Sequence, residues 1–246
     1  MQNPPILMQN SDEPLSALEL KLSEETVKIE TWFRKQWCDY QMPFTTSVDI
    51  RNAGYKMAVI DTNLFPAGFN NIHSAQIPLA HLAVQHYWQR YMPQCEKIVL
   101  VPENHSRNMH YFHSLLVLST ILTKAGFDVK IASIDPTLKS AKTITVEGAG
   151  EFTLYPLERT ENSVHIENFK PCAVILNNDL SEGIPEILND IRQPIYPPLA
   201  LGWDSRLKSE HFLHYKTVCH SFAELLSLDP WLFNPLFRNC GDINFM

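Results

Sequence analysis

The chain of 246 residues is long enough to bury a sizeable core, either as one large domain or as two small ones. Its hydrophobic content of 45% and charged content of 19% are those of an ordinary globular protein. The net charge of −7 argues against a general nucleic-acid-binding surface, although local arginines and lysines could still bind a small anion.

The cysteines and the N-terminus indicate the compartment. The five cysteines are widely separated and include no Cys-x-x-Cys pair, which argues against a zinc site and against a disulfide framework. Residues 1–14 lack a basic segment followed by a long apolar run, and no stretch of the chain reaches transmembrane length. We therefore expect a cytoplasmic protein that does not contact membranes.

The first part of the chain predicts an arm, two helices and an irregular segment. Residues 1–12 predict a flexible arm, and we expect 13–246 to form a single domain. Apolar residues at spacings of three, four and seven predict a helix over 14–37. Glycines and prolines in the following polar segment, 47–71, predict short extended pieces joined by turns, with a brief strand in it. A second helix is predicted over 79–92.

The middle of the chain predicts a parallel sheet. Buried strands are predicted at 97–103 and 127–134, and a helix at 107–125 lies between them. This unit has the length of a parallel crossover, which is expected to be right-handed. Alternation around Gly-Ala-Gly predicts a hairpin over 143–157, and another buried strand is predicted at 173–179.

At least one more helix is expected within 206–228. Together these elements predict an α/β fold, in which a mainly parallel sheet has flanking helices and a small β-hairpin.

Two predicted strands end in polar runs, at 103–108 and 177–179. In an open parallel sheet, ligands bind beyond the carboxyl ends of the strands. Ser106 or Asn177 alone fits a helix cap better than a ligand contact. For the run 103–108 as a whole, a functional site is favoured over a turn and helix cap, because the run combines a carboxylate, an imidazole and a guanidinium. The candidate substrate-binding residues from these runs are Glu103, Asn104, Arg107 and Asn178.

A third polar segment spans 202–212. Its Arg206 and Lys208 could hold a phosphate or carboxylate group. From the charge pattern alone, a solvated helix face is the better interpretation. No GxGxxG, GxxxxGK[ST], GxSxG or HExxH motif is present. His110 and His113 lie three residues apart, as do His211 and His214, but neither pair has a third ligand, so the residues identify no metal site.

The segment 47–71 carries side chains of the kinds that can recognise an amino acid. Cations can neutralise a carboxylate, carboxylates can bind an ammonium group, and amides supply donors and acceptors. The residues concerned are Arg51, Lys56, Asp49, Asp61, Asn52, Asn63, Asn70 and Asn71. An irregular loop that satisfies its own polar groups explains these residues about equally well.

Five stretches together resemble one known family, the proteobacterial-type glutamate–cysteine ligases of the ATP-grasp superfamily. The most specific is SVDIRNAGYKMAVIDTNLFPAGFNN, and the resemblance runs from about residue 15 to the end of the chain. The stretches are 29–37, 47–71, 101–108, 175–185 and 202–212.

The resemblance implies an enzyme that joins L-glutamate and L-cysteine to γ-glutamylcysteine, using ATP and Mg²⁺, in the first step of glutathione biosynthesis. It implies an acyl-phosphate route, in which glutamate is activated before the cysteine amine attacks. On this interpretation Arg51 and Lys56 are catalytic and contact a substrate carboxylate or the acyl phosphate. Asp49 and Asp61 would bind ammonium groups, and the four asparagines would orient the substrate.

Members of the resembled family are longer than this chain, and their Mg²⁺ ligands lie in the later part. The last ten residues, 237–246, contain no such ligand cluster. We therefore expect the N-terminal, substrate-binding part of a ligase, of the parallel-sheet type that precedes the ATP-grasp lobes, whose partner is the C-terminal ATP-grasp part. The alternative is a non-catalytic module that binds an amino acid or another protein and is left by truncation.

Overall fold

The structure is a computed structural model. It describes residues 14–53, 56–103, 108–202, 205 and 208–235. None of the helices among these residues is both long enough and apolar enough to cross a membrane.

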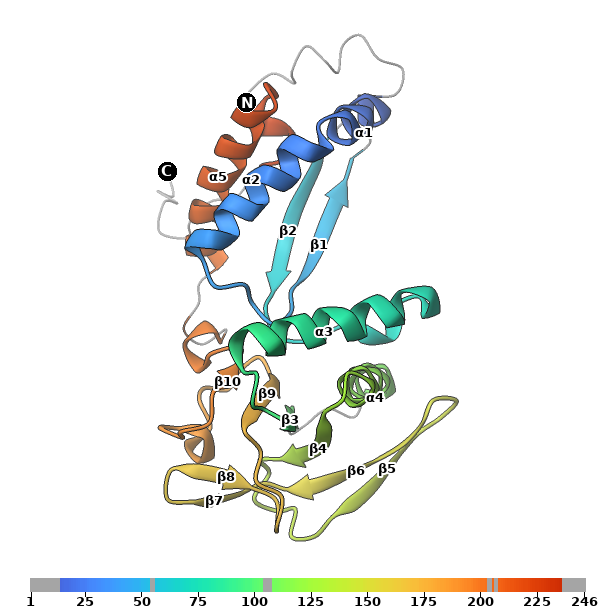
Figure 1. Cartoon of the computed structure of the whole chain (residues 1–246), viewed down its shortest axis with the longest axis vertical. Coiled ribbons are helices and arrows are strands. Elements are labelled where there is room, and N and C mark those ends of the chain that lie inside the picture. Colours follow the sequence, from blue (N-terminus) through green and yellow to red (C-terminus); the bar gives the residue numbers. More distant parts are fainter. Residues whose placement is uncertain (1–13, 54–55, 104–107, 203–204, 206–207, 236–246) are drawn as a thin grey trace, which may run out of the picture. The chain divides into compact units, whose positions relative to one another are not determined.

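The chain divides into two compact units (Figure 1). The first unit comprises Met1–Met42, Val48–Thr62 and Arg206–Met246, and the second comprises Pro43–Ser47 and Asn63–Ser205. The first unit is therefore built from segments far apart in the sequence, which is why the sequence pattern predicts one domain without showing this division.

The second unit is built on a six-stranded sheet with the order β10-β9-β3-β4-β6-β5. Every neighbouring pair is parallel except β5 and β6, which form the predicted antiparallel hairpin. A separate small hairpin, β7 and β8, is also antiparallel. The predicted α/β class with a mainly parallel sheet is confirmed. The strands are β3 (Lys97–Pro102), β4 (Asp128–Ser133), β5 (Lys142–Val146), β6 (Gly150–Pro156), β7 (Glu158–Thr160), β8 (Ser163–His165), β9 (Ala173–Asn177) and β10 (Ile195–Tyr196).

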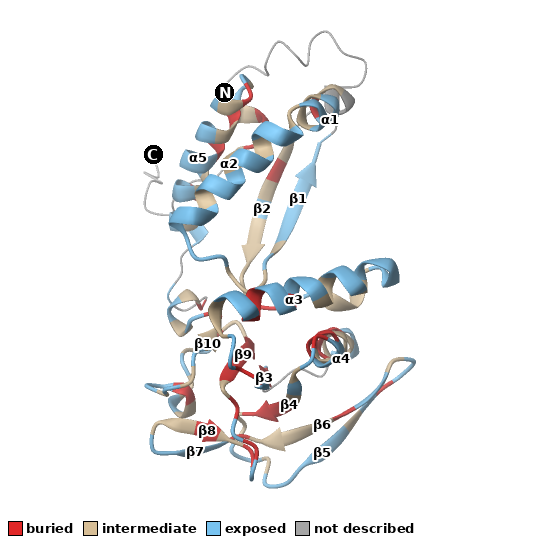
Figure 2. Cartoon of the chain, in the orientation of Figure 1, coloured by how far each residue is buried: buried red, intermediate tan, exposed pale blue. Residues whose placement is uncertain are grey.

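The central strand β3 is apolar on both faces because both faces of the sheet are covered. Ile98 and Leu100 point into a core shared with helices α3 (Ile77–Tyr91) and α4 (Met109–Lys124). Val99 and Val101 point to the opposite core, which includes residues of the β7–β8 hairpin and the segment that follows β9. Figure 2 shows these buried strands. A strand buried on both faces explains the continuous apolar run in the sequence.

The described residues of the first unit form three α-helices, a short 3-10 helix and a two-stranded sheet. A small core forms between α1, α5 and the chain after α5, and it includes Leu18, Cys219 and Phe233. The sheet lies in this unit except for its outermost residues, Ser47 and Asn63. The elements are α1 (Pro14–Glu24), α2 (Thr26–Asp39), β1 (Ser47–Asn52), β2 (Met57–Asn63) and α5 (Lys208–Leu225). The segment after residue 47 is thus more regular than predicted.

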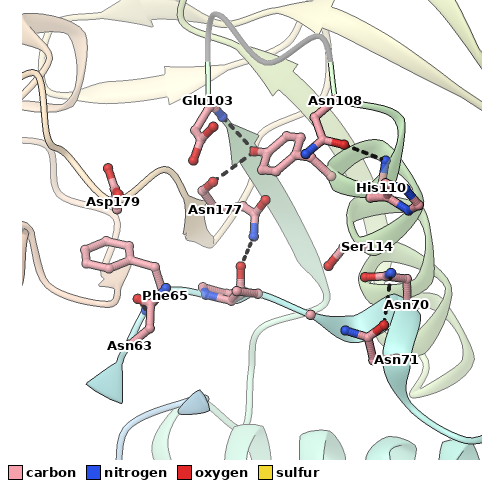
Figure 3. A pocket seen from close by; sticks show the side chains of 14 residues that line it. Asn63, Phe65, Asn70, Asn71, Glu103, Asn108, His110, Ser114, Asn177 and Asp179 are labelled. Carbon is pink, nitrogen blue, oxygen red and sulfur yellow. Dashed lines mark hydrogen bonds between the residues drawn. The ribbon is translucent and has the colours of Figure 1, made fainter. Parts of the chain in front are cut away.

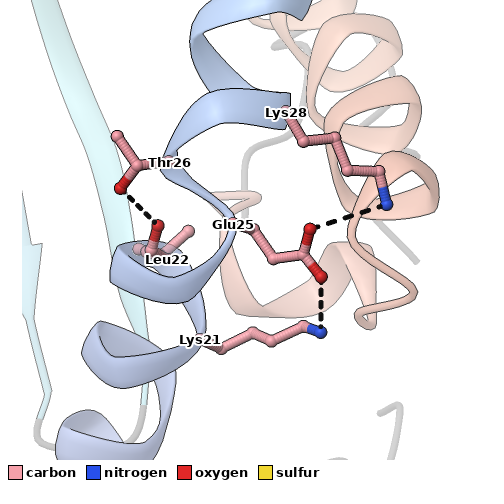
Figure 4. Close-up of polar contacts among 5 residues, drawn as sticks. All are labelled: Lys21, Leu22, Glu25, Thr26 and Lys28. Carbon is pink, nitrogen blue, oxygen red and sulfur yellow. Dashed lines mark hydrogen bonds and ion pairs between the residues drawn. The ribbon is translucent and has the colours of Figure 1, made fainter.

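The single helix predicted over 14–37 is interrupted at Glu25, between α1 and α2 (Figure 4). Its carboxylate lies 3.0 Å from Lys21 Nζ and 3.9 Å from Lys28 Nζ. The hydrogen bond from Lys21 is the main cause that lowers the pKa of Glu25. Thr26 Oγ1 donates to the backbone carbonyl of Ser23 at 2.6 Å. Such side-chain bonds compete with the regular helical ladder and favour a break here.

A disulfide joins Cys95 and Cys172, although the spacing of the cysteines argues against a disulfide framework. These residues precede β3 and β9, which are parallel neighbours, so the sheet brings their Cα atoms to 5.5 Å. They are 77 residues apart, and the strand order that pairs them is not visible in cysteine spacing. Cys38 and Cys219 are free thiols, and Cys240 lies outside the described residues.

Candidate functional site

A pocket of about 440 Å³ lies at the carboxyl ends of β3 and β9. The two strands end in register, with Pro102 opposite Asn177. From β3 the chain passes through α4 to β4 on one side, whereas β9 flanks β3 on the other side. The crevice between strands whose connections diverge in this way is where ligands bind in open α/β sheets.

Three segments of the second unit line the pocket (Figure 3). They follow β2, β3 and β9, and the middle segment includes the first turns of α4. The polar lining residues are Asn63, Asn70, Asn71, Glu103, Asn108, His110, Tyr111, Ser114, Asn177 and Asp179.

Tyr111 ties the ends of β3 and β9 together. Its hydroxyl accepts a hydrogen bond of 2.8 Å from the backbone N–H of Glu103 and donates one of 2.9 Å to the backbone carbonyl of Asn177. Burial raises the pKa of Tyr111, so the phenol stays protonated and remains a donor. The two strand ends are therefore held at a fixed separation.

Asn177 holds the segment that follows β2. The residue is 5% exposed, and its Nδ2 donates to the backbone carbonyl of Pro66. Its other amide atom, Oδ1, is buried and has no hydrogen-bond partner among the described residues. A buried acceptor without a donor is costly in a folded protein. This oxygen is therefore a candidate contact for a ligand.

One side of the pocket is acidic. Glu103 and Asp179 both line it, and the described lining residues include no lysine or arginine. Partial desolvation raises the pKa of Glu103, and the negative charges of Asp179 and Glu182 raise it further. Asp179 Oδ1 accepts from the backbone N–H of Ser181 at 3.0 Å, which fixes the turn after β9. This side can stabilise a positively charged group.

The other side of the pocket is lined by amides and the start of α4 (Figure 3). Asn108 caps the helix, since its Oδ1 accepts from the backbone N–H of His110 at 2.9 Å. Ser114 Oγ accepts from the N–H of Phe69 at 3.0 Å and so holds the segment with Asn70 and Asn71. A helix N-terminus favours negative charge. The two sides together complement a molecule with both charges.

Comparison with known proteins identifies the family to which the chain belongs. The family model described as GshA, glutamate-cysteine ligase, matches residues 19–246. The chain belongs to the glutamate–cysteine ligase family. A crystal structure of a proposed gamma-glutamylcysteine synthetase from Methylobacillus flagellatus KT matches with a TM-score of 0.89 and 42% identity. The match covers 100% of this chain and 57% of that chain. No curated protein matches this sequence.

Four of the residues predicted for the ligase site line this pocket: Asn63, Asn70, Asn71 and Glu103. Asn178 does not line it, because its Oδ1 accepts from the backbone N–H of Leu180 at 2.9 Å and forms a turn. Asn104 and Arg107 lie outside the described residues.

Tyr111, Asn177 and Asp179 line this pocket but are not among the site residues predicted from the sequence. The polar run after the predicted strand at 173–179 indicates a site at this end of the sheet, but it does not show which side chains face the pocket. Tyr111 lies three residues after Asn108 at the start of the predicted helix, a spacing that places both on one helix face. That spacing was the available signal.

The remaining predicted residues of the ligase site belong to the first unit or are undescribed. Asp49, Arg51 and Asn52 are exposed on β1, and Arg206 lies outside the described residues. Lys208 Nζ lies 3.1 Å from Asp61 Oδ2, so these two predicted substrate contacts pair with each other.

Lys56 lies in an apolar setting in the first unit. Its Nζ is 4.3 Å from the centroid of a Trp231 ring, is buried, and has no hydrogen-bond partner among the described residues. Burial lowers the pKa of Lys56, and the nearby charge of Asp229 partly opposes this shift. A ring contact of this kind stabilises a cation without any substrate. A catalytic role for Lys56 stays a prediction.

Proposed function

We propose that this chain carries the amino-acid-binding part of an ATP-dependent glutamate–cysteine ligase. The enzyme joins the γ-carboxylate of L-glutamate to the amine of L-cysteine, which is the first step of glutathione biosynthesis. The family match over residues 19–246 carries this proposal. The pocket beyond β3 and β9 supports it, because its acidic side and its helix N-terminus suit a zwitterion.

The γ-carboxylate would take the γ-phosphoryl group of ATP, which releases ADP and gives an acyl phosphate. The cysteine amine would then displace phosphate, lose a proton and form the amide bond. The described residues do not fit a magnesium–ATP site. Among them no group of three or more His, Cys, Asp or Glu side chains could hold a metal ion, and the described pocket lining has no cation for a phosphate. We therefore propose that ATP and Mg²⁺ bind in an ATP-grasp part of the enzyme, which is this chain's partner.

The chain's own residues would bind and orient the amino acids. In the second unit, Asn63, Asn70 and Asn71 supply amide donors and acceptors, and Ser114 holds the segment that contains Asn70 and Asn71. Tyr111 positions the strand ends through its two hydrogen bonds and keeps the pocket in one shape. A rigid pocket of this kind reduces the entropic cost of orienting a substrate.

The roles proposed for the first unit rest on charge complementarity. Arg51 is exposed on β1 and would contact a substrate carboxylate or the acyl phosphate. Lys56 would do so only by leaving the Trp231 ring. Asp49 and Asp61 would bind ammonium groups, although Asp61 would first have to separate from Lys208.

The second candidate is a module that binds an amino acid without ligase chemistry. The pocket favours it to the same degree, because its lining can bind a zwitterion whether or not ATP is used. The two candidates differ in ATP use: the ligase consumes ATP, whereas the module binds an amino acid without it.

The test is ADP release with Mg-ATP, glutamate and cysteine, with each amino acid omitted in turn. The chain is assayed alone and with the separately expressed remainder of the homologous ligase. We expect release that requires both amino acids in the reconstituted protein. Amino-acid binding without any such release would support the second candidate instead.

A further inference from the structure

The pocket lining contains a buried hydrogen-bond acceptor that has no donor among the described residues. Nδ2 of Asn177 is committed to the carbonyl of Pro66, which can only accept, so the orientation of the amide is fixed. Oδ1 is then the atom left without a partner, in a residue that is 5% exposed. Figure 3 shows Asn177 in the same part of the pocket lining as Glu103.

Two carboxylates share the pocket with this oxygen. Glu103 follows β3, and Asp179 follows β9, so the register of the two strands brings them to the same edge of the sheet. Asp179 uses Oδ1 in the turn with Ser181, which leaves its second oxygen for other contacts. The pKa of Glu103 is raised by desolvation and by the charges of Asp179 and Glu182. A bound cation would relieve this repulsion.

We propose that Glu103, Asp179 and Oδ1 of Asn177 form a subsite for the α-ammonium group of an amino-acid substrate. An ammonium group has three N–H donors and one positive charge, which match three acceptors of which two are carboxylates. The identity of the ligand as an amino acid rests on the proposed function. The amides and the first turn of α4 on the other side of the pocket would receive its carboxylate.

The subsite suits glutamate better than cysteine. The cysteine amine is the nucleophile of the proposed reaction, and it must be neutral when it attacks. An ammonium group held between two carboxylates keeps its proton, because opposite charges stabilise its charged form. The α-ammonium group of glutamate does not react and can stay charged throughout. We therefore assign the subsite to glutamate.

Isothermal titration of the 246-residue chain tests the subsite. The ligands are glutamate and glutarate, which lacks the amine, and cysteine and 3-mercaptopropionate, which form the same kind of pair. We expect glutamate to bind at least about tenfold more tightly than glutarate, since the amine makes charge-assisted bonds. Glu103→Gln and Asp179→Asn should each reduce this difference to about threefold or less. Glu147→Gln, an exposed carboxylate in the β5–β6 turn, should leave it unchanged.

Several outcomes would overturn the subsite. One is equal affinity of the parent chain for glutamate and glutarate. Another is a preference for glutamate that persists unchanged in both variants. Binding of Mg²⁺ alone that Glu103→Gln weakens would show a metal site instead. Loss in the variants of a preference for cysteine over 3-mercaptopropionate would confirm the ammonium subsite but overturn its assignment to glutamate.

The failure of this inference and the failure of the proposed function can be told apart. One outcome is a preference for glutamate over glutarate that both variants reduce, with no ADP release in the reconstituted protein. It would support the subsite and contradict the ligase function. ADP release that requires both amino acids, with a glutamate KM unchanged in Glu103→Gln and Asp179→Asn, would leave the function standing and remove the subsite.

Discussion

The hydroxyl of Tyr111 donates a hydrogen bond of 2.9 Å to the backbone carbonyl of Asn177, a residue 66 positions further along the chain. The same oxygen accepts from the backbone N–H of Glu103. One side chain on α4 thus connects the carboxyl ends of the two strands that carry the acidic side of the pocket. The geometry of the candidate site therefore depends on a residue that lies between its two acidic segments.

Removal of this hydroxyl tests that dependence. Tyr111→Phe leaves a backbone donor and a backbone acceptor without a partner, which should lower the free energy of unfolding by about 1–3 kcal/mol. Urea denaturation measures this change, and amino-acid affinity should fall with it. Tyr155→Phe is the control, because no hydrogen bond is seen for its hydroxyl in the described part of the chain. Equal stability of the two variants would contradict the bridging role.

Gly202 is required by a close approach to the turn that carries Asp179. A Cβ atom at this position would lie 2.7 Å from Leu180 Cβ and 3.3 Å from the backbone oxygen of Asp179. The φ of Gly202 is −65°, so the conformation itself would suit alanine. Gly202→Ala should therefore cost about 1–3 kcal/mol in thermal or urea unfolding through overpacking, and it should weaken amino-acid binding.

A second variant isolates the contact. Leu180 has a φ of 59°, which favours glycine, and Leu180→Gly removes the atoms that the new methyl group would meet. In the Leu180→Gly background, Gly202→Ala should cost at least about 1 kcal/mol less than in the parent chain. Additive costs in this double-mutant cycle would refute the contact as the cause.

The raised pKa of Glu103 predicts a pH dependence of stability. Between the unfolded value near 4.3 and the raised folded value, the folded protein binds more protons than the unfolded chain. The free energy of unfolding contributed by Glu103 therefore falls as the pH rises through this window. Glu103→Gln should flatten that part of the profile in urea denaturation across the acidic range. An unchanged slope would mean that the desolvation is not significant in solution.

The first-unit cations have a prediction of their own. If Arg51 contacts the substrate carboxylate or the acyl phosphate, Arg51→Ala should abolish turnover in the reconstituted ligase, whereas Arg34→Ala on exposed α2 should not. Lys56→Met keeps an unbranched side chain against Trp231 but removes the charge. A folded Lys56→Met protein with normal kcat/KM would show that Lys56 is structural. Near-normal kcat/KM in Arg51→Ala would show that Arg51 is not part of the site.

The ion pair of Asp61 and Lys208 should contribute little stability. Both side chains are substantially exposed, at 36% and 54%. Exposed pairs contribute about 0–1 kcal/mol, and salt screens them. A double-mutant cycle with Asp61→Asn and Lys208→Met should therefore give a coupling energy below about 1 kcal/mol. A larger coupling would indicate that the pair fixes the first unit and is not available to a substrate.

The sequence predicts much of the second unit because its signals are local. The apolar runs that became β3 and β9 and the helix that became α4 are visible as patterns, and so are the polar residues that follow the strands. The order of the strands is not local. The proximity of Glu103 to Asp179, and of Cys95 to Cys172, follows from β9 lying beside β3, which no spacing in the chain shows.

The polar segment 47–71 shows the limit of sequence reasoning most clearly. It looks like one recognition set, yet Asp49, Arg51 and Lys56 belong to the first unit, whereas Asn70 and Asn71 line the pocket of the second unit. Residues that are neighbours in the chain are separated because the strand pair β1–β2 carries the chain into one unit and then back to the other. Charge complementarity alone cannot detect such a division.

The most direct measurement is a crystal structure of the 246-residue chain with bound L-glutamate, and in a second crystal with L-cysteine. We expect glutamate in the pocket beyond β3 and β9, with its ammonium group within hydrogen-bond distance of Glu103, Asp179 and Asn177 Oδ1 and its α-carboxylate towards α4. Glutamate bound only against Asp49, Arg51 or Lys56 of the first unit, with this pocket empty at saturating concentration, would contradict it.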